Sequence, residues 1–327
     1  MIESSKKIIP EKTKLKIKMK KVWIAGHKGM VGRALVKRLS NEDLELIYQE
    51  KKDLNLLEYE SVSKFLRKEK PDMVFVAAGK VGGILANNNF PASFIYENLA
   101  IASNIINSCH KNDIQDLIYL GSSCIYPRDC KQPIKEEYLL TGELEKTNQW
   151  YAIAKISGLK LCEAYNQQYN RNYLSVQPTN LYGPHDNFNL KTSHVLPALL
   201  RKVYEAKKNN TPNIEIWGTG KSLREFLYVD DLADALFFLS QKETKENLIN
   251  IGSDDETSII ALAKMIFSVL NYNCKIDLDL SKPDGTPRKK LDTSKMRNLG
   301  WQNKINLEEG IRLTFDWFKN NLKDFRD

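Results

Sequence analysis

Short apolar runs alternate with helical patterns through the first half of the chain. The runs have the length of buried strands and cover residues 21–25, 44–48, 72–78, 116–121 and 172–178. Helical periodicity covers residues 30–39, 92–109 and 150–169. Strands that alternate with helices predict βαβ units and a parallel sheet.

The pattern changes beyond residue 184. We expect helices over 193–208, 257–270 and 307–321, a strand over 213–217, and a strand, turn and helix over 225–240. The predicted fold class is therefore α/β, a Rossmann-type doubly wound parallel sheet with a smaller α/β substrate domain. Residues 21–183, with 225–251 returning, are expected to form the NADP-binding domain, and 184–224 and 252–327 the substrate domain.

The composition excludes several classes of protein. With 42% hydrophobic and 28% charged residues, the chain can bury a core, which excludes wholesale disorder. No apolar run reaches the ~18 residues of a membrane helix, and no secretory signal is evident. The five cysteines have no metal-ligand spacing, so we expect reduced thiols, no metal site and a cytoplasmic protein.

The positive charge is concentrated at the N-terminus. Residues 1–21 hold eight lysines and two glutamates, so they carry six of the eight net charges. We expect residues 1–20 to be a disordered leader; the alternative is an arm for nucleic acid or an anionic membrane. The body of the protein therefore predicts neither a nucleic-acid nor a membrane partner.

Three glycines at intervals of three follow the first strand. Gly26, Gly29 and Gly32 form a GxxGxxG that opens the 30–39 helix. Glycines permit a tight turn and let the backbone approach a pyrophosphate at the helix N-terminus. The alternative is a purely structural turn, but the strand before it and the helix after it favour a dinucleotide site.

The residues after the second strand bear on the cofactor. Glu50 stands where an acid commonly holds the ribose 2′-hydroxyl of NAD. Lys28, Lys51 and Lys52 would equally neutralise the 2′-phosphate of NADP. We favour NADP(H).

Two further pairs of residues indicate chemistry at a carbonyl. Tyr151 and Lys155 share a helix face, and a lysine beside a phenol is expected to lower its pKa and make it a proton donor. Ser122 and Cys124 follow the 116–121 strand and, if extended, point the same way. A cysteine near a strand is commonly an inert buried thiol, so Cys124 alone does not indicate catalysis.

At these positions the sequence resembles the extended short-chain dehydrogenase/reductase family. The glycine turn, the serine of GSSCIYP (121–127) and the Tyr151–Lys155 pair carry the resemblance. Longer strings are similar to members that act on GDP-linked 4-keto sugars: AGHKGMVG, KVGGILANN, YAIAKI, PTNLYGPHDNF, SHVLPALLRK and KPDGTPRK. The similarity runs from about residue 21 to the C-terminus.

The resemblance implies 3,5-epimerisation of a GDP-linked 4-keto-6-deoxymannose, followed by NADPH-dependent reduction at C4. It implies that Cys124 is a base and His194 an acid, while Ser122 and Tyr151 hold the C4 oxygen and Lys155 the cofactor ribose. His194 opens the 193–208 helix, whose dipole would lower its pKa. A lone histidine there is commonly a surface or capping residue, and the matched string favours function.

The resemblance also implies contacts to the two nucleotides. For the cofactor they are Gly26, Lys28, Gly29, Met30, Val31, Gly32, Lys51, Leu120, Gly121, Lys155, Pro178, Asn180 and Leu181. For the GDP-sugar they are Lys202 and Arg224 at the diphosphate, Trp217 at the guanine, and Asp284. The structural alternatives are a core role for Trp217 and a solvated helix position for Lys202.

Family members commonly pair two long helices each across a dimer, so we expect a homodimer. The nearest alternative function is a nucleotide-sugar 4-epimerase or 4,6-dehydratase that recycles bound NAD. Dehydratases carry an acid beside the catalytic serine or threonine, where this chain has Ser123 and Cys124.

Overall fold

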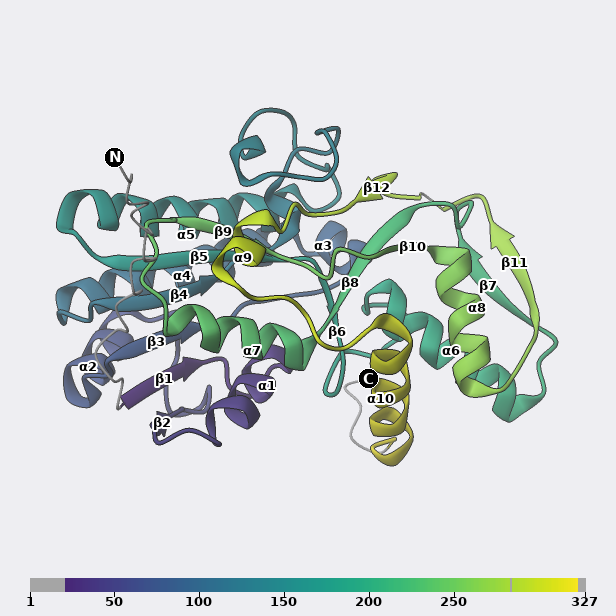
Figure 1. Cartoon of the computed structure of the whole chain (residues 1–327), viewed down its shortest axis with the longest axis horizontal. Coiled ribbons are helices and arrows are strands. Elements are labelled where there is room, and N and C mark those ends of the chain that lie inside the picture. The colour runs from purple at the N-terminus through teal and green to yellow at the C-terminus, as the bar shows by residue number, and fades with distance from the viewer. Residues whose placement is uncertain (1–20, 283, 323–327) are drawn as a thin grey trace, which may run out of the picture.

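The computed structural model describes residues 21–282 and 284–322 (Figure 1). The leader predicted over residues 1–20 lies outside the described residues. Six parallel strands form the main sheet in the order β2–β1–β3–β4–β5–β9. Their bounds are β1 Lys21–Ala25, β2 Glu45–Ile47, β3 Met73–Val76, β4 Asp116–Leu120, β5 Asn172–Pro178 and β9 Leu248–Ile251.

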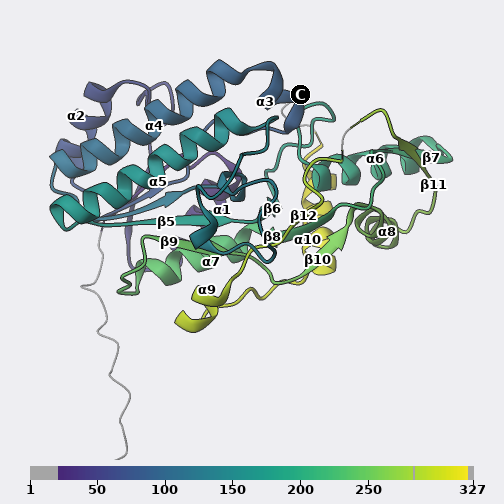
Figure 2. The same ribbon diagram turned by 90° about the horizontal axis from the view of Figure 1, so that it is seen from above.

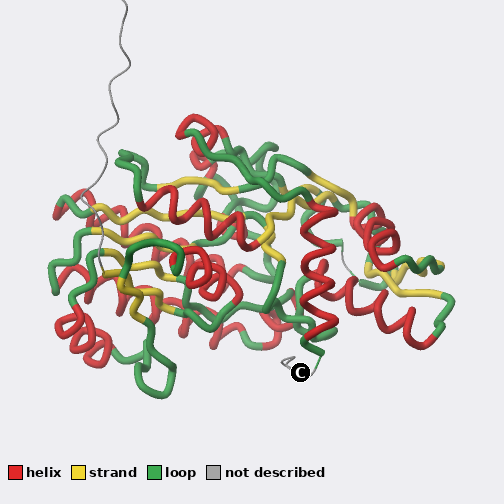
Figure 3. Tube along the Cα trace, turned by 60° about the horizontal axis from the view of Figure 1, so that its bottom comes forward, coloured by secondary structure: helices red, strands yellow, loops and turns green. Residues whose placement is uncertain are grey.

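Helices cover both faces of this sheet, as Figures 2 and 3 show. Alternate residues of β1 point to opposite faces, so Ile24 packs in the core formed with α1 (Met30–Leu39) and α7 (Val229–Ser240). Trp23 packs in the other core, under three helices. These are α2 Tyr59–Glu69, α4 Pro91–Lys111 and α5 Gln149–Tyr169.

A smaller set of strands lies beyond the carboxyl ends of the main sheet (Figure 1). Strand β8 pairs in parallel with β6 and β12 and antiparallel with β10, and β7 pairs in parallel with β11. The strands are β6 Asn180–Tyr182, β7 Asn213–Trp217, β8 Leu223–Tyr228, β10 Glu256–Ser258, β11 Lys275–Asp279 and β12 Arg288–Lys289. The helices packed with them are α6 Val195–Asn209, α8 Ile259–Leu270 and α10 Leu307–Asn320.

The predicted α/β fold class is confirmed. The division into two domains stays a prediction. Within the segment 225–251, α7 packs against the main sheet and β9 is a strand of it. Residues 225–228 instead belong to β8, which pairs within the smaller set of strands. The remaining helices are α3 Ile84–Asn89 and α9 Ser294–Leu299, with 3₁₀ turns at Ser123–Ile125 and Glu136–Tyr138.

The glycine turn is packed against neighbouring backbone. Gly26 has φ of +89°, and a Cβ there would lie 2.7 Å from the backbone of Ala78. A Cβ on Gly32 would lie 2.1 Å from the carbonyl oxygen of Gly26. Gly26 therefore requires glycine because of its positive φ and the segment that follows β3, and Gly32 requires glycine because the turn between β1 and α1 folds back onto it.

Gly32→Ala tests this packing. Because backbone rather than a side-chain tip stands in the way, we expect the free energy of unfolding to fall by about 1–3 kcal/mol. The measurement is denaturant unfolding, with Gly29→Ala as the control, since the nearest atom to a Cβ there is 3.4 Å away. Equal effects of the two substitutions would contradict the argument.

Candidate active site

A cavity of about 320 Å³ is lined by segments that follow strands of the main sheet and by residues of the smaller set of strands. Ten of the predicted catalytic, cofactor-binding and substrate-binding residues line it: Ser122, Cys124, Tyr151, Asn180, Leu181, His194, Lys202, Trp217, Arg224 and Asp284. Segments far apart in the sequence thus meet at the carboxyl edge of the main sheet, where ligands bind in open α/β folds.

A buried glutamine positions the serine. The Ser122 amide donates to Gln177 Oε1 at 2.6 Å, and the Ser122 hydroxyl oxygen accepts from the Cys124 amide at 3.3 Å. Ser122 is extended, but residues 123–125 form a 3₁₀ turn, so the strand geometry considered for Ser122 and Cys124 together is not present. The turn nevertheless leaves both residues on the cavity wall.

Tyr151 lies in the first turn of α5 and is buried. Burial raises the pKa of its phenol, and the Cys124 thiol adds to this, while a hydrogen bond with Ser122 acts in the opposite direction. The expectation that Lys155 lowers this pKa is not met in the structure. The Lys155 ammonium lies 5.8 Å from the Tyr151 ring centre and donates instead to the Leu120 carbonyl at 2.7 Å.

Lys155 itself is strongly affected by its surroundings. Burial lowers the pKa of its ammonium to about 8. An ammonium has three donors, and the Leu120 carbonyl oxygen takes one of them. Ribose hydroxyls of a dinucleotide are acceptors that fit this buried donor.

His194 is the N-cap residue of α6 and remains accessible from the cavity. Its pKa is lowered as expected, but the main cause is the loss of water between the cavity walls, followed by the charge of Lys289. The Lys289 ammonium also lies 3.4 Å from Cys124 Sγ. Sequence reasoning missed Lys289, although the matched string KPDGTPRK contained it.

The buried carboxylate of Glu225 fixes the position of Lys289. It accepts backbone N–H groups of Ser253 at 2.8 Å, Asp254 at 3.0 Å and Leu291 at 3.0 Å. Strand β12 also pairs with β8, which places Lys289 opposite Arg224. These contacts bring a loop from the end of the chain to the cysteine.

The far end of the cavity carries cations and an exposed indole. Trp217 is 43% exposed, which excludes the alternative of a core residue, and its Nε1–H donates to Glu215 Oε1 at 3.1 Å. The Lys202 ammonium lies 6.0 Å from the indole and donates to the Glu215 carbonyl at 2.8 Å. Burial lowers the pKa of Lys202 and of Arg224, so both are cations in partly dehydrated surroundings.

Asp284 makes hydrogen bonds within the protein itself. Its carboxylate accepts from the Thr219 amide at 2.7 Å and from the Thr219 hydroxyl at 2.9 Å. Its carbonyl oxygen accepts from Arg224 at 3.2 Å. It therefore shapes the loop at the cavity, and its contact with a nucleotide-sugar stays a prediction.

The glycine turn suits a pyrophosphate. Gly29 caps α1 without a side-chain hydrogen bond, and the first turn, which contains Met30 and Val31, has no acidic residue. Its N–H groups and helix dipole fit an anion.

The other predicted cofactor residues lie at the ends of neighbouring strands. Leu120 and Gly121 at the end of β4 and Pro178 at the end of β5 are buried. Asn180 donates to the Glu225 carbonyl at 2.8 Å. Lys28 pairs with Glu50, and Lys51 is exposed beside them.

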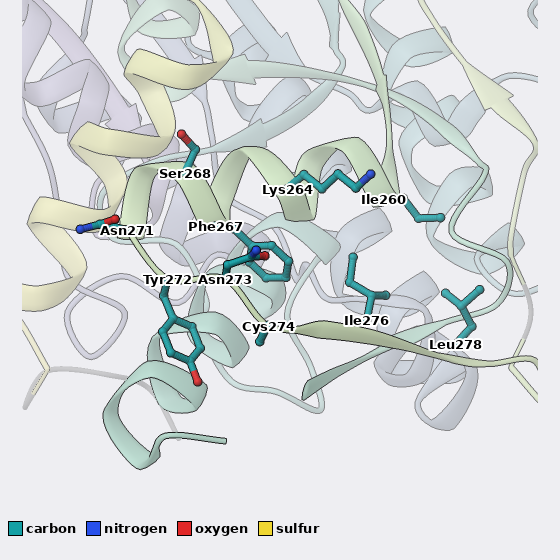
Figure 4. A pocket seen from close by; sticks show the side chains of 10 residues that line it. All are labelled: Ile260, Lys264, Phe267, Ser268, Asn271, Tyr272, Asn273, Cys274, Ile276 and Leu278. Carbon is teal, nitrogen blue, oxygen red and sulfur yellow. The ribbon is translucent and has the colours of Figure 1, made fainter. Parts of the chain in front are cut away.

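A second cavity, of about 840 Å³, lies between α8 and β11 (Figure 4). Its residues are Ile260, Lys264, Phe267, Ser268, Asn271, Tyr272, Asn273, Cys274, Ile276 and Leu278. It contains none of the predicted site residues and no acid–base pair. Over the part of the chain that the structure describes, no cluster of three potential metal ligands is present.

The fold and the cleft define a nucleotide-binding enzyme of the Rossmann type. The chain belongs to the NAD dependent epimerase/dehydratase family, which matches residues 22–252. The family expected from the sequence is thus confirmed. No helix in the described residues is long and apolar enough to span a membrane.

Particular relatives cover nearly the whole chain. GDP-L-fucose synthase from Sinorhizobium fredii (strain NBRC 101917 / NGR234) is 50% identical over 305 residues, covering 93% of this chain and 97% of that protein. GDP-L-fucose synthase from Escherichia coli (strain K12) is 50% identical over 316 residues, covering 94% and 98%. The structure of a GDP-L-fucose synthetase from Naegleria fowleri bound to NADP matches with a TM-score of 0.88 and 30% identity, covering 99% and 100%.

Lys155→Met tests the burial of the ammonium. The pKa of Lys155 falls from 10.5 to about 8 on folding, so its burial destabilises the fold fully below pH 8 and progressively less up to pH 10.5. We expect the variant to be more stable than the wild type by roughly 2–3 kcal/mol at pH 7, with a difference that shrinks between pH 8 and 10.5.

The measurement is denaturant unfolding of the cofactor-free protein across this pH range. Lys160→Met is the matched control, since Lys160 lies on the same helix and is exposed. A stability difference that does not change with pH would show that the ammonium is not penalised by burial.

Proposed function

We propose that this chain converts GDP-4-keto-6-deoxy-D-mannose to GDP-L-fucose by epimerisation at C3 and C5 and reduction at C4. The observation that carries the proposal is that Cys124 and His194 line the same cavity as Ser122 and Tyr151. Two relatives at 50% identity bear the name of this activity. A thiol and an imidazole supply the base and acid that inversion requires, next to groups that hold a ketone.

The hydrogens at C3 and C5 are acidic because the C4 carbonyl lies between them. Ser122 and the phenol of Tyr151 donate to the C4 oxygen and stabilise the enolate that forms when a proton leaves. Cys124 removes the proton from one face, and His194 returns one from the other. Lys289 lies beside this sulfur, with its ammonium 3.4 Å from Cys124 Sγ.

Reduction uses the same residues. The glycine turn would hold the pyrophosphate of NADPH and Lys155 its ribose, and the bound cofactor would supply the hydride for C4. The raised pKa of Tyr151 keeps the phenol protonated at neutral pH, so it can donate its proton to the C4 oxygen. Lys202 and Arg224 bind the diphosphate of GDP, and the exposed face of Trp217 stacks on guanine.

Reaction in heavy water tests the proposal. With GDP-4-keto-6-deoxymannose and NADPH, we expect loss of NADPH absorbance and GDP-fucose that carries deuterium at C3 and C5. Cys124→Ser should slow deuterium incorporation by about 100-fold or more, because a positioned base contributes at least that factor. Direct reduction of the ketone should fall much less.

Cys130→Ser is the control, since this cysteine lies outside the cavity lining. Turnover without consumption of NADPH would refute the reductase step. Equal loss of exchange and reduction in Cys124→Ser would refute the role of base.

We also propose a homodimer formed through α4 and α5. The two helices lie side by side on the outer face of the molecule (Figure 2), and His110 stacks on Tyr169 between them. Tyr96 and Leu99 on α4 are 65% and 41% exposed, and Trp150 and Ile153 on α5 are 42% and 37% exposed. An apolar stripe across two adjacent helices is typical of an interface between subunits.

Leu99→Asp combined with Ile153→Asp should convert the dimer to a monomer, because charges would be buried between the subunits. Sedimentation velocity measures the change. Leu280→Asp, at a residue 70% exposed after β11, should leave the dimer intact. A monomeric wild-type protein, or an unchanged double variant, would contradict the interface.

We further propose a cytoplasmic location. All five cysteines are free thiols, and two of them, Cys109 and Cys162, are buried away from solvent. This state fits a reducing compartment.

A further inference from the structure

An ion pair stands at the outer corner of the glycine turn. The Lys28 ammonium donates to Glu50 Oε1 at 2.6 Å, and Lys52 lies 4.0 Å from Glu50 Oε2. The hydrogen bond from Lys28 lowers the pKa of the Glu50 carboxyl, so Glu50 is ionised at neutral pH. The side chains of Lys28 and Glu50 are 55% and 43% exposed, so a ligand can reach both.

The backbone fixes the place of this pair. The Glu50 carbonyl accepts from the Asp53 and Leu54 amides, both at 2.9 Å, and Leu54 is buried. The Lys28 carbonyl accepts from Arg33 Nε at 3.2 Å. Residue 50 follows β2 and residue 28 follows β1, and these are adjacent strands of the main sheet.

The ring stack beside the pair defines the same corner. His27 and Tyr48 stack with centroids 4.9 Å apart; His27 directly precedes Lys28, and Tyr48 lies two residues before Glu50. In a fold of this kind the adenosine ribose lies at the end of the second strand. A carboxylate there accepts a ribose 2′-hydroxyl, and a cation there attracts a 2′-phosphate. This chain presents both groups, bonded to each other.

We infer that Glu50 sets the dinucleotide preference and that the protein uses NADH as well as NADPH. The Glu50 carboxylate accepts the 2′-hydroxyl of NADH while keeping its bond to Lys28. The 2′-phosphate of NADPH must draw Lys28 away from Glu50 and then lies near a negative charge. The inference rests on the proposed hydride transfer, but it concerns a different part of the cofactor.

The competition between the two anions predicts a small preference. We expect the wild-type protein to bind NADH within about tenfold of NADPH, because one opposing charge at a solvated site changes affinity by roughly that factor. Glu50→Gln should tighten NADPH by about tenfold and weaken NADH severalfold. Lys28→Met should weaken NADPH by about tenfold and change NADH by less.

The experiment is direct titration of each reduced dinucleotide, followed by nicotinamide fluorescence, in the absence of sugar. Glu42→Gln is the matched control, since Glu42 is also a partly exposed acid, paired with Arg38 at 2.6 Å at the end of α1. The ratio of the two dissociation constants is the readout, because a general loss of folded protein cancels in it. The preference for NADPH in Glu50→Gln should fall as salt is raised.

A wild-type preference for NADPH above about a thousandfold, or a ratio that Glu50→Gln leaves unchanged, would overturn the inference. In either case ketone reduction with NADPH would persist and the proposed function would stand. Failure of the wild-type protein to bind either dinucleotide would overturn both this inference and the proposed function. The ratio of kcat/KM for the two cofactors, measured with the keto sugar, should follow the ratio of affinities.

Discussion

The cleft depends on the buried carboxylate of Glu225. This group is fully enclosed, and three backbone N–H donors from residues 253, 254 and 291 compensate for the loss of water around it. Through these bonds β8, the loop after β9 and the loop that carries Lys289 are held as one unit. A carboxylate in such a position specifies geometry, because removing it would leave several buried amides without an acceptor.

Burial in the cleft destabilises the cations that line it. Burial disfavours the charged forms of Lys155, Lys202 and Arg224. Diphosphate groups and ribose hydroxyls are the ligands that restore what water no longer supplies. A site of this kind is less stable than an apolar one of the same shape, and binding recovers the difference.

Local spacing accounts for what the sequence predicts well. The long helices around residues 92–109 and 150–169 agree with α4 and α5 to within two residues at each end, and the glycine turn and the Tyr151–Lys155 pair are matters of nearby residues. The contacts that escaped prediction join distant segments. Lys289 and Cys124 are 165 residues apart, and Gln177 and Ser122 are 55 apart. The pKa of Tyr151 escaped for the same reason, since its burial is decided by tertiary packing.

The order of the chain has a consequence for its synthesis. The segment from β1 to β5 emerges first, and it contains the glycine turn, the serine, the cysteine and the tyrosine. The sixth strand, β9, and the loop held by Glu225 emerge much later, so Cys124 meets Lys289 only after residue 291 has left the ribosome. A nascent or truncated chain therefore carries the cysteine without its neighbouring ammonium, and the two groups meet only once the fold is complete.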